Sequence, residues 1–177
     1  MIGPSAEKRP ELRLVEGAIE APVEWSWFCG HCAAPSPGGE VPAPAARVCR
    51  SCGLGLLLEA REDAVPEHDD AFLVVDSSLR VHGLSRHAER LLGIREDLAV
   101  NRPLSELVVP ADAEAGSRSG LAAAVAEAIG SESEPQHAFV RPANTFGVRV
   151  RARIVACGPP RAALIVLEGG RPRLRAV

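Results

Sequence analysis

Four of the five cysteines of this chain form two close pairs, Cys29 with Cys32 and Cys49 with Cys52. Two residues separate the members of each pair, and sixteen residues lie between the pairs. A two-residue gap folds into a tight turn that points both thiolates at one ion, and two such turns complete a tetrahedron. The spacing therefore predicts a closed, structural four-cysteine metal site, for which Zn²⁺ is the expected ion.

Other uses of these cysteines fit the pattern less well. Disulfides are disfavoured in a reducing cytosol, and neither pair has the βαβ context of a thioredoxin-like redox site. An iron centre of the rubredoxin kind uses similar turns and stays open as an alternative. Gly30 and Gly53 suit the turns because glycine tolerates positive φ. His31 is expected to be an exposed turn residue and not a ligand.

Both tryptophans of the chain directly precede the first cysteine pair, although aromatic residues make up only 3% of the sequence. On a strand, Trp25 and Trp27 would share one face, since side chains alternate. Two interpretations stay open at this stage. The indoles either pack the small core around the metal site, or press on a neighbouring domain or partner.

Strands are expected at Trp25–Phe28 and Leu54–Glu59, on either side of the cysteines. With them, residues 25–60 resemble the zinc ribbon family, whose members bind nucleic acid or protein or brace a neighbouring domain. This stretch holds two arginines and two glutamates. Because binding to phosphates needs a basic excess, contact with protein is favoured over contact with nucleic acid.

The character of the chain changes at Asp69, where apolar strands and amphipathic helices begin. A helix capped by Ser85 should end at Gly93, which suits a left-handed cap. A second helix is expected over 117–129, and a short helical turn over 102–107. The expected strands follow from apolar runs and turn residues, and they span 71–75, 80–84, 136–141, 146–156 and 161–168.

This order of elements, with the sequence of residues 71–108, resembles the PAS domain family, and the resemblance covers about residues 66–169. The family pairs a helix of the type N/S-x-A-x-x-L-L-G with a following G/N-R-P-L-x-E-L, and here serine stands where asparagine is usual. The resemblance implies an α+β fold with a five-stranded antiparallel sheet in the spatial order 2-1-5-4-3 and helices on one face. The matching residues are Asp76, Ser85, Ala88, Leu91, Leu92, Gly93, Arg102, Pro103, Leu104 and Leu107.

Two of the expected strands, Ala71–Val75 and Ala162–Leu167, are apolar on both faces, whereas Arg149, Arg151 and Arg153 alternate with apolar residues. In the implied order the two apolar strands are neighbours at the centre of the sheet. Their outer face would be an exposed hydrophobic patch unless something covers it. The candidates are the N-terminal segment, the zinc ribbon, or a second subunit in a homodimer formed through this face.

The chain therefore divides into five segments. These are residues 1–24 with a short helix built on Leu12, Leu14, Val15 and Ile19, a zinc ribbon at 25–60, a linker at 61–68, a PAS domain at 69–169 and a tail at 170–177.

The residues expected to matter for a PAS cofactor are absent. The helices of residues 85–130 contain no cysteine, so covalent flavin is not expected, and the helix over 117–129 has no histidine, so haem is not expected. A small apolar ligand stays open. His82, His87 and His137 are expected to be surface or hydrogen-bonded histidines and not iron ligands. The three arginines are expected to form a solvated face or a docking stripe. Cys157 is expected to be a free thiol in a hairpin turn, with a redox switch as the alternative.

No phosphate-binding loop or nucleophile elbow is present, so an enzyme is not expected. One lysine against nineteen arginines suggests a GC-rich bacterial genome. No apolar run of membrane-spanning length occurs. The first residues, which alternate acidic and basic side chains, contain no hydrophobic signal core, so a cytoplasmic protein is expected. The predicted function is a sensory or signalling module that acts through protein contacts. The alternative is a zinc-ribbon transcription regulator that contacts nucleic acid or RNA polymerase.

Overall fold

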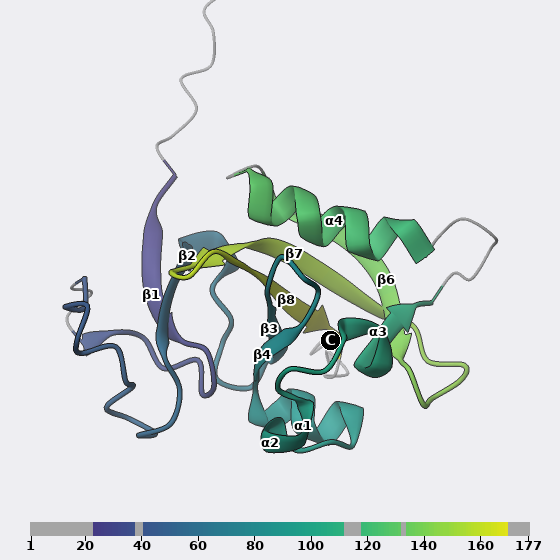
Figure 1. Cartoon of the computed structure of the whole chain (residues 1–177), viewed down its shortest axis with the longest axis horizontal. Helices are drawn as coiled ribbons and strands as arrows, with labels where there is room; N and C mark the ends of the chain where they lie inside the picture. Colours follow the sequence, from purple (N-terminus) through teal and green to yellow (C-terminus); the bar gives the residue numbers. More distant parts are fainter. Residues whose placement is uncertain (1–22, 38–40, 112–117, 132–133, 170–177) are drawn as a thin grey trace, which may run out of the picture.

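A computed structural model describes residues 23–37, 41–111, 118–131 and 134–169. The short helix expected around Leu12–Ile19 and the tail over 170–177 lie outside these residues. The described chain forms a curled antiparallel sheet of eight strands with helices packed against it (Figure 1). Within it, no helix has both the length and the apolar character needed to cross a membrane.

The elements follow the predicted order with some additions. The strands are β1 Trp25–Cys29, β2 Leu57–Arg61, β3 Ala71–Val75, β4 Val81–Leu84, β5 Val108–Pro110, β6 Gln136–Pro142, β7 Val150–Gly158 and β8 Ala162–Glu168. The helices are a 3₁₀ turn at Glu62–Ala64, α1 Arg86–Leu92, α2 Glu96–Ala99, α3 Leu104–Leu107 and α4 Arg118–Gly130.

The central strands are arranged as expected, in the order β4-β3-β8-β7, with β6 on the other edge of β7. This is the 2-1-5-4-3 order that the resemblance to PAS domains implies. The expected count of five strands and the separate zinc-ribbon subdomain are not confirmed, because the described strands form one sheet of eight. β5 pairs with β6, and the hairpin of β1 and β2 joins the same sheet through β7.

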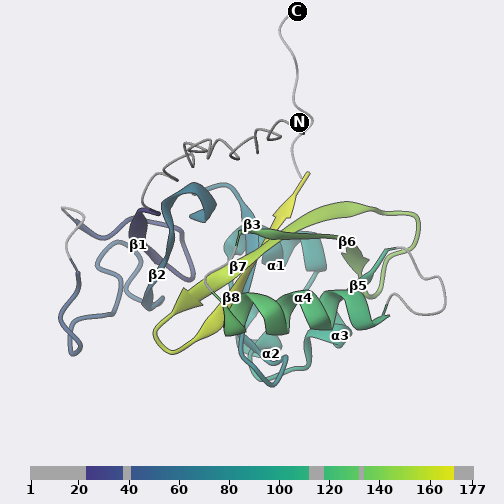
Figure 2. The ribbon, with the colours of Figure 1, turned by 90° about the horizontal axis from the view of Figure 1, so that it is seen from above.

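The joining of the hairpin depends on the length of β7. β6 pairs with residues Val150 to Ile154 of β7, which leaves the far end of that edge open. There, Glu59 and Ala60 of β2 pair with Gly158 and Cys157. The sequence prediction started this strand too early, at Phe146, and ended it too early, at Ala156. Figures 1 and 2 show the hairpin beside the turn from β7 to β8.

Local signals set the ends of α1. The Ser85 side chain accepts a hydrogen bond from the Ala88 N–H, and Gly93 ends the helix with φ of 65°. Ser85 also accepts from the Phe72 N–H at 3.0 Å, so the same cap ties the helix to β3. Both ends of this helix were predicted, whereas α2 and β5, each only one turn or a few residues long, were not.

One face of the sheet, called the inner face here, packs against the helices. Leu73 of β3 and Ile165 of β8 are fully buried there with Ile154 of β7. Ala88 of α1 and Val125 of α4 belong to the same cluster. The apolar positions of alternating strand residues thus meet the apolar stripes of the helices, as in any two-layer domain.

The opposite, outer face is covered by the segment that carries the four cysteines, residues 25–61, called the cysteine lobe here. Phe72 and Leu164 are fully buried on this face although they alternate with inner-face residues. The Phe28 ring meets the Phe72 ring edge-on, with centroids 6.2 Å apart. Leu58 and Ala60 of β2 join the same cluster. The sequence left open what covers the apolar outer face, and within the described chain it is the cysteine lobe.

Candidate metal centre and the adjoining cleft

The four predicted ligand cysteines come together at the base of the cysteine lobe, with all four sulfurs within 4.8 Å of one another. The Sγ atoms of Cys29 and Cys52 are 3.7 Å apart, and those of Cys32 and Cys49 are 3.9 Å apart. A tetrahedral zinc ion with Zn–S distances of about 2.3 Å requires its sulfurs to lie roughly 3.8 Å from one another. The residues therefore fit a four-thiolate ion.

The two cysteine turns have the same backbone geometry. Ala33 N donates to the Cys29 carbonyl at 3.0 Å, and Gly53 N donates to the Cys49 carbonyl at 2.8 Å. The residue after the second cysteine has positive φ in both turns, 58° for Ala33 and 70° for Gly53. The prediction for Gly53 is confirmed. The prediction for Gly30 is wrong, because Ala33 takes the left-handed conformation in the first turn.

Backbone N–H groups point at the sulfurs. His31 N and Cys32 N lie 3.4 Å and 3.5 Å from Cys29 Sγ, and Gly55 N lies 3.4 Å from Cys52 Sγ. Such donors favour the thiolate form that metal binding requires. A Cβ at Gly55 would collide with the Cys29 sulfur and approach the His31 Cβ to 2.7 Å. The cradle therefore requires glycine at position 55.

The environment changes the acidity of these thiols in opposite directions. Burial raises the pKa of Cys29 well above its usual range. At Cys52, burial also raises the pKa, but hydrogen bonds from the Gly55 and Leu54 backbone and the neighbouring thiols outweigh it and lower the pKa to about 6. The backbone donors around Cys52 thus favour its thiolate form, whereas burial disfavours the thiolate form of Cys29.

Trp27 lies on the metal side of the hairpin. Trp27 packs with Cys29, Cys49 and Leu57, and the Arg47 guanidinium lies 5.8 Å from the centre of its ring. The sequence left two interpretations open, and for Trp27 the structure supports the first: its indole packs in the small core around the metal site. Phe28, whose side chain points the other way, is the residue that packs on the outer face. The position of Phe28 could have been predicted from the sequence. Side chains alternate along a strand, so a strand that buries Trp27 on one side must present Phe28 on the other.

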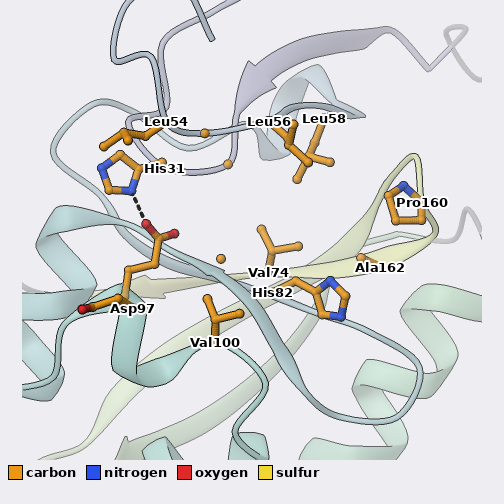
Figure 3. A pocket seen from close by; sticks show the side chains of 14 residues that line it. His31, Leu54, Leu56, Leu58, Val74, His82, Asp97, Val100, Pro160 and Ala162 are labelled. Carbon is orange, nitrogen blue, oxygen red and sulfur yellow. Dashed lines mark ion pairs between the residues drawn. The ribbon is translucent and has the colours of Figure 1, made fainter. Parts of the chain in front are cut away.

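His31 does not lie where the sequence predicted. Its side chain is only 8% exposed, and Nδ1 is 2.7 Å from Glu96 Oε2 of α2 (Figure 3). The other Glu96 oxygen accepts a hydrogen bond from Leu84 N at 2.9 Å. His31 is turned inward because the cysteine lobe folds over the sheet, which the spacing of cysteines does not reveal. The pair joins the first cysteine turn to β4 and α2.

A cleft of about 540 Å³ separates the cysteine lobe from the sheet and α2 (Figure 3). This volume lies in the usual range of small-molecule sites, and such sites combine apolar walls with a few polar groups. The apolar lining comes from both parts of the molecule, namely Leu54, Leu56, Leu58, Val74, Val100, Pro160 and Ala162. The polar side chains of the lining are those of His31, His82, Glu96 and Asp97.

The polar side chains of the cleft are already paired. Besides the His31–Glu96 contact, His82 Nε2 lies 2.9 Å from an oxygen of Asp76, and Asp97 receives two hydrogen bonds of 2.9 Å from Arg95. Charged groups that are paired within the protein give little binding energy to a charged ligand. The cleft therefore suits an uncharged and mainly aliphatic molecule.

The other residues named from the sequence lie apart from the four cysteines. His137 is exposed on β6, and His87 lies beside Arg90 on α1. The prediction that Cys157 lies in a hairpin turn is wrong. Cys157 is buried on β7 beneath the cysteine lobe. Burial raises the pKa of Cys157 to about 12. Because reactivity needs the thiolate, its position gives it no role as an exposed redox switch.

No protein-family model and no curated protein matches this chain. The chain is similar to solved structures of PAS type. One is the photoactive yellow protein domain of the sensor histidine kinase Ppr from Rhodospirillum centenum, at 18% identity and a TM-score of 0.41, covering 57% of this chain and 85% of that one. Another is the PAS domain of a Desulfitobacterium hafniense protein, at 16% identity and a TM-score of 0.41, covering 56% and 90% respectively.

Proposed function

We propose that this chain is a PAS-type sensory or signalling module that acts through protein contacts, with Zn²⁺ at the four cysteines as a structural ion. One observation carries the proposal. The lobe that holds the cysteines buries the outer face of the sheet and shares a cleft with it. Because the lobe meets the sheet across this cleft as well as through packed side chains, a ligand in the cleft could change how closely the two parts lie.

The role of the ion follows from the closed donor set. Four thiolates leave no open position, so a bound zinc ion would supply folding energy and not catalysis. Cys29, Cys32, Cys49 and Cys52 would hold it, and no catalytic step is part of the proposal. Reduced thiolates of this kind suit the cytoplasm, where disulfides are rare.

The cleft supplies the sensory half of the proposal. A bound molecule would touch Leu56 of the cysteine lobe and Val100 beside α2 at the same time. It would therefore have a different affinity for states in which the two parts are close together or further apart. Such a difference in affinity is what allows a ligand to shift a conformational equilibrium. The expected ligand class is uncharged and mainly aliphatic, because the polar lining groups are already paired.

The test uses the intact metal-loaded chain and Nile red, an uncharged apolar fluorophore. We expect saturable binding with a blue-shifted emission. Val100→Asp places a charge in the cleft and should weaken binding by about tenfold. Leu98→Asp is the matched control, since Leu98 is 62% exposed on α2 and is not part of the lining. Native mass spectrometry of the same sample reports the metal and any molecule retained from purification.

Two outcomes contradict the proposal. Absence of saturable binding by the metal-loaded chain would show that the cleft is not a ligand-binding site. Equal binding by the Val100→Asp and Leu98→Asp variants would place the fluorophore elsewhere on the surface. Retention of an aliphatic molecule in native mass spectra, lost in Val100→Asp, would support it directly.

A further inference from the structure

Among the residues that the structure describes, the cysteine lobe covers only part of the outer face, and the part that it leaves uncovered has an unusual composition. The cysteine lobe packs on Val155 of β7 and Val166 of β8 but no further along these strands. The next outer positions are Arg153 and Glu168, which lie at the border. The uncovered part, called the Arg-Phe face here, comprises His137, Phe139, Arg141, Phe146, Arg149, Arg151, Arg153 and Glu168.

Two of the four phenylalanines of the chain are exposed on this face. Phe139 is 45% exposed and Phe146 is 84% exposed, whereas the other two, Phe28 and Phe72, are fully buried against each other. Large apolar side chains that gather on one surface indicate an interaction site more often than isolated ones do. An aromatic-poor chain thus presents half of its phenylalanines to solvent in one place.

Arginines stack on both rings. The Arg149 guanidinium carbon lies 3.8 Å from the centre of the Phe139 ring, and that of Arg141 lies 4.8 Å from the centre of the Phe146 ring. Arg141 also donates to the carbonyl oxygens of Pro142, Ala143 and Thr145 at 3.1 to 3.3 Å. The guanidinium is therefore held in place by carbonyl groups, which do not neutralise its charge.

The face has a positive charge in a chain whose net charge is −3. Its eight residues include four arginines and one carboxylate, that of Glu168, which lies 3.5 Å from Arg151 and 3.0 Å from Arg153. Phe139 faces Arg151 across the strand pair, and His137 faces Arg153. The charge and the aromatic rings are thus interleaved on one surface and not separated.

We propose that the Arg-Phe face binds an acidic peptide segment of a partner protein, one in which Asp or Glu residues alternate with apolar side chains. The Arg151 side chain is 53% exposed and only 3.5 Å from one carboxylate, and the planar N–H edge of a guanidinium matches a carboxylate of a bound peptide. The exposed rings offer contact area to the apolar side chains between the carboxylates. Arginine and aromatic residues are also the types that dominate binding energy at protein interfaces.

Nucleic acid fits this surface less well. A single strand would place a phosphate charge at every nucleotide, and it would have to cross Glu168 or the border with the cysteine lobe. At that border Arg153 donates to the Asp63 carbonyl, and the Asp63 side chain is 57% exposed. A second copy docked about a two-fold axis would bring the arginines of the two copies together. A short acidic segment avoids both repulsions.

This inference rests on the proposed function, because it names the surface for the protein contact. It is tested with the full chain and a short fluorescein-labelled peptide that alternates Asp and Glu with Leu and Phe. Two further probes are a peptide of equal charge with Ser in place of Leu and Phe, and labelled oligo(dT). Fluorescence anisotropy at several salt concentrations gives the affinity, and sedimentation gives the oligomeric state.

We expect the first peptide to bind, with an affinity that falls as salt rises, and the serine peptide to bind at least about tenfold more weakly. Phe146→Ser and Arg149→Glu should each weaken binding by about tenfold. Arg90→Glu on α1 is the control, since it changes the same charge on another exposed surface. Circular dichroism confirms that each variant is folded.

Three results would overturn the inference: no binding of the acidic peptide, equal affinity in Phe146→Ser and Arg90→Glu, or binding of oligo(dT) at least as tight as that of the peptide. Self-association that the Phe146→Ser variant abolishes would assign the face to a second copy instead. Nile red binding in the same samples separates this inference from the proposed function, because the cleft does not include any residue of the Arg-Phe face.

Discussion

The two faces of the central sheet are buried by different means. On the inner face, Leu73 and Ile165 lie beneath four helices in a large cluster of aliphatic side chains. On the outer face, Phe72 and Leu164 lie beneath a two-stranded hairpin whose own core is four cysteines, Trp27 and Leu57. The same strands therefore contribute alternate residues to two covers, one made of helices and one built around four cysteines that could hold a metal ion.

The difference shows how a short segment can bury a hydrophobic surface. The cysteine lobe has too few apolar residues to fold by burial alone, as is usual for segments of this length. Under the proposed function, a structural ion at the four cysteines would replace the missing core. The helical cover needs no such ion, and so removing the metal should distinguish the two faces.

The largest effect is expected from Cys49→Ser. It removes a ligand that is only 2% exposed, and structural zinc contributes on the order of 10 kcal/mol in small zinc peptides. The amides of residues 25–61 should lose protection from hydrogen exchange, and the apolar outer face should bind 1-anilinonaphthalene-8-sulfonate. Protection of Leu73 and Ile165 should persist. Hydrogen-exchange mass spectrometry with metal analysis measures all three.

Cys157→Ala is the matched control for this prediction. Cys157 is equally buried but is not one of the four clustered cysteines, so metal content and the protection of the lobe should stay close to those of the natural chain. Loss of protection on both faces together in Cys49→Ser would mean that the sheet is one cooperative unit. The distinction between the two covers would then be wrong.

The second prediction concerns the contact between the lobe and the sheet. Phe28→Ala should cost about 3 to 5 kcal/mol, since it empties a fully buried site against Phe72, but it leaves the sulfurs in place. Leu73→Ala on the inner face should cost about 2 to 5 kcal/mol. Urea unfolding gives the free energies. Phe28→Ala should retain metal, and release of the metal would show that docking and ligation cannot be separated.

Much of this arrangement could be predicted from sequence. The cysteine spacing identified the four clustered residues, and the apolar character of Ala71–Val75 on both sides indicated that something must cover the outer face. The cap at Ser85 and the stop at Gly93 fixed α1. These are local signals, in which neighbouring residues alone determine the geometry.

The parts that were missed depend on contacts between distant segments. Nothing near Glu59 shows that it pairs with Gly158, so the hairpin was taken for a separate subdomain. His31 was placed in solvent because its partner, Glu96, lies in another element. The Arg149–Phe139 stack depends likewise on the register of β6 against β7.

The third prediction concerns the one described ion pair that links the cysteine lobe to α2. The His31→Ala and Glu96→Gln changes should show a coupling free energy of about 1 kcal/mol in a double-mutant cycle, since the His31 side chain is buried. The Arg95–Asp97 pair is the control. Its side chains are 77% and 60% exposed, and surface pairs of this kind contribute little. Equal coupling in the two cycles would mean that His31 does not connect the two parts.

The smallest effect compares the two cysteine turns themselves. Gly53→Ala should cost about 1 kcal/mol, because φ of 70° disfavours a side chain and a Cβ there would find no atom within 4 Å to pack against. Ala33 has the same backbone conformation, but its methyl group is buried against the outer face. Ala33→Gly relieves the backbone and loses that packing, so its net effect should be within about 0.5 kcal/mol of zero. Urea unfolding of the metal-loaded variants measures both, and a clear stabilisation by Ala33→Gly would show that the turn is held by the metal alone and gains nothing from the sheet beneath it.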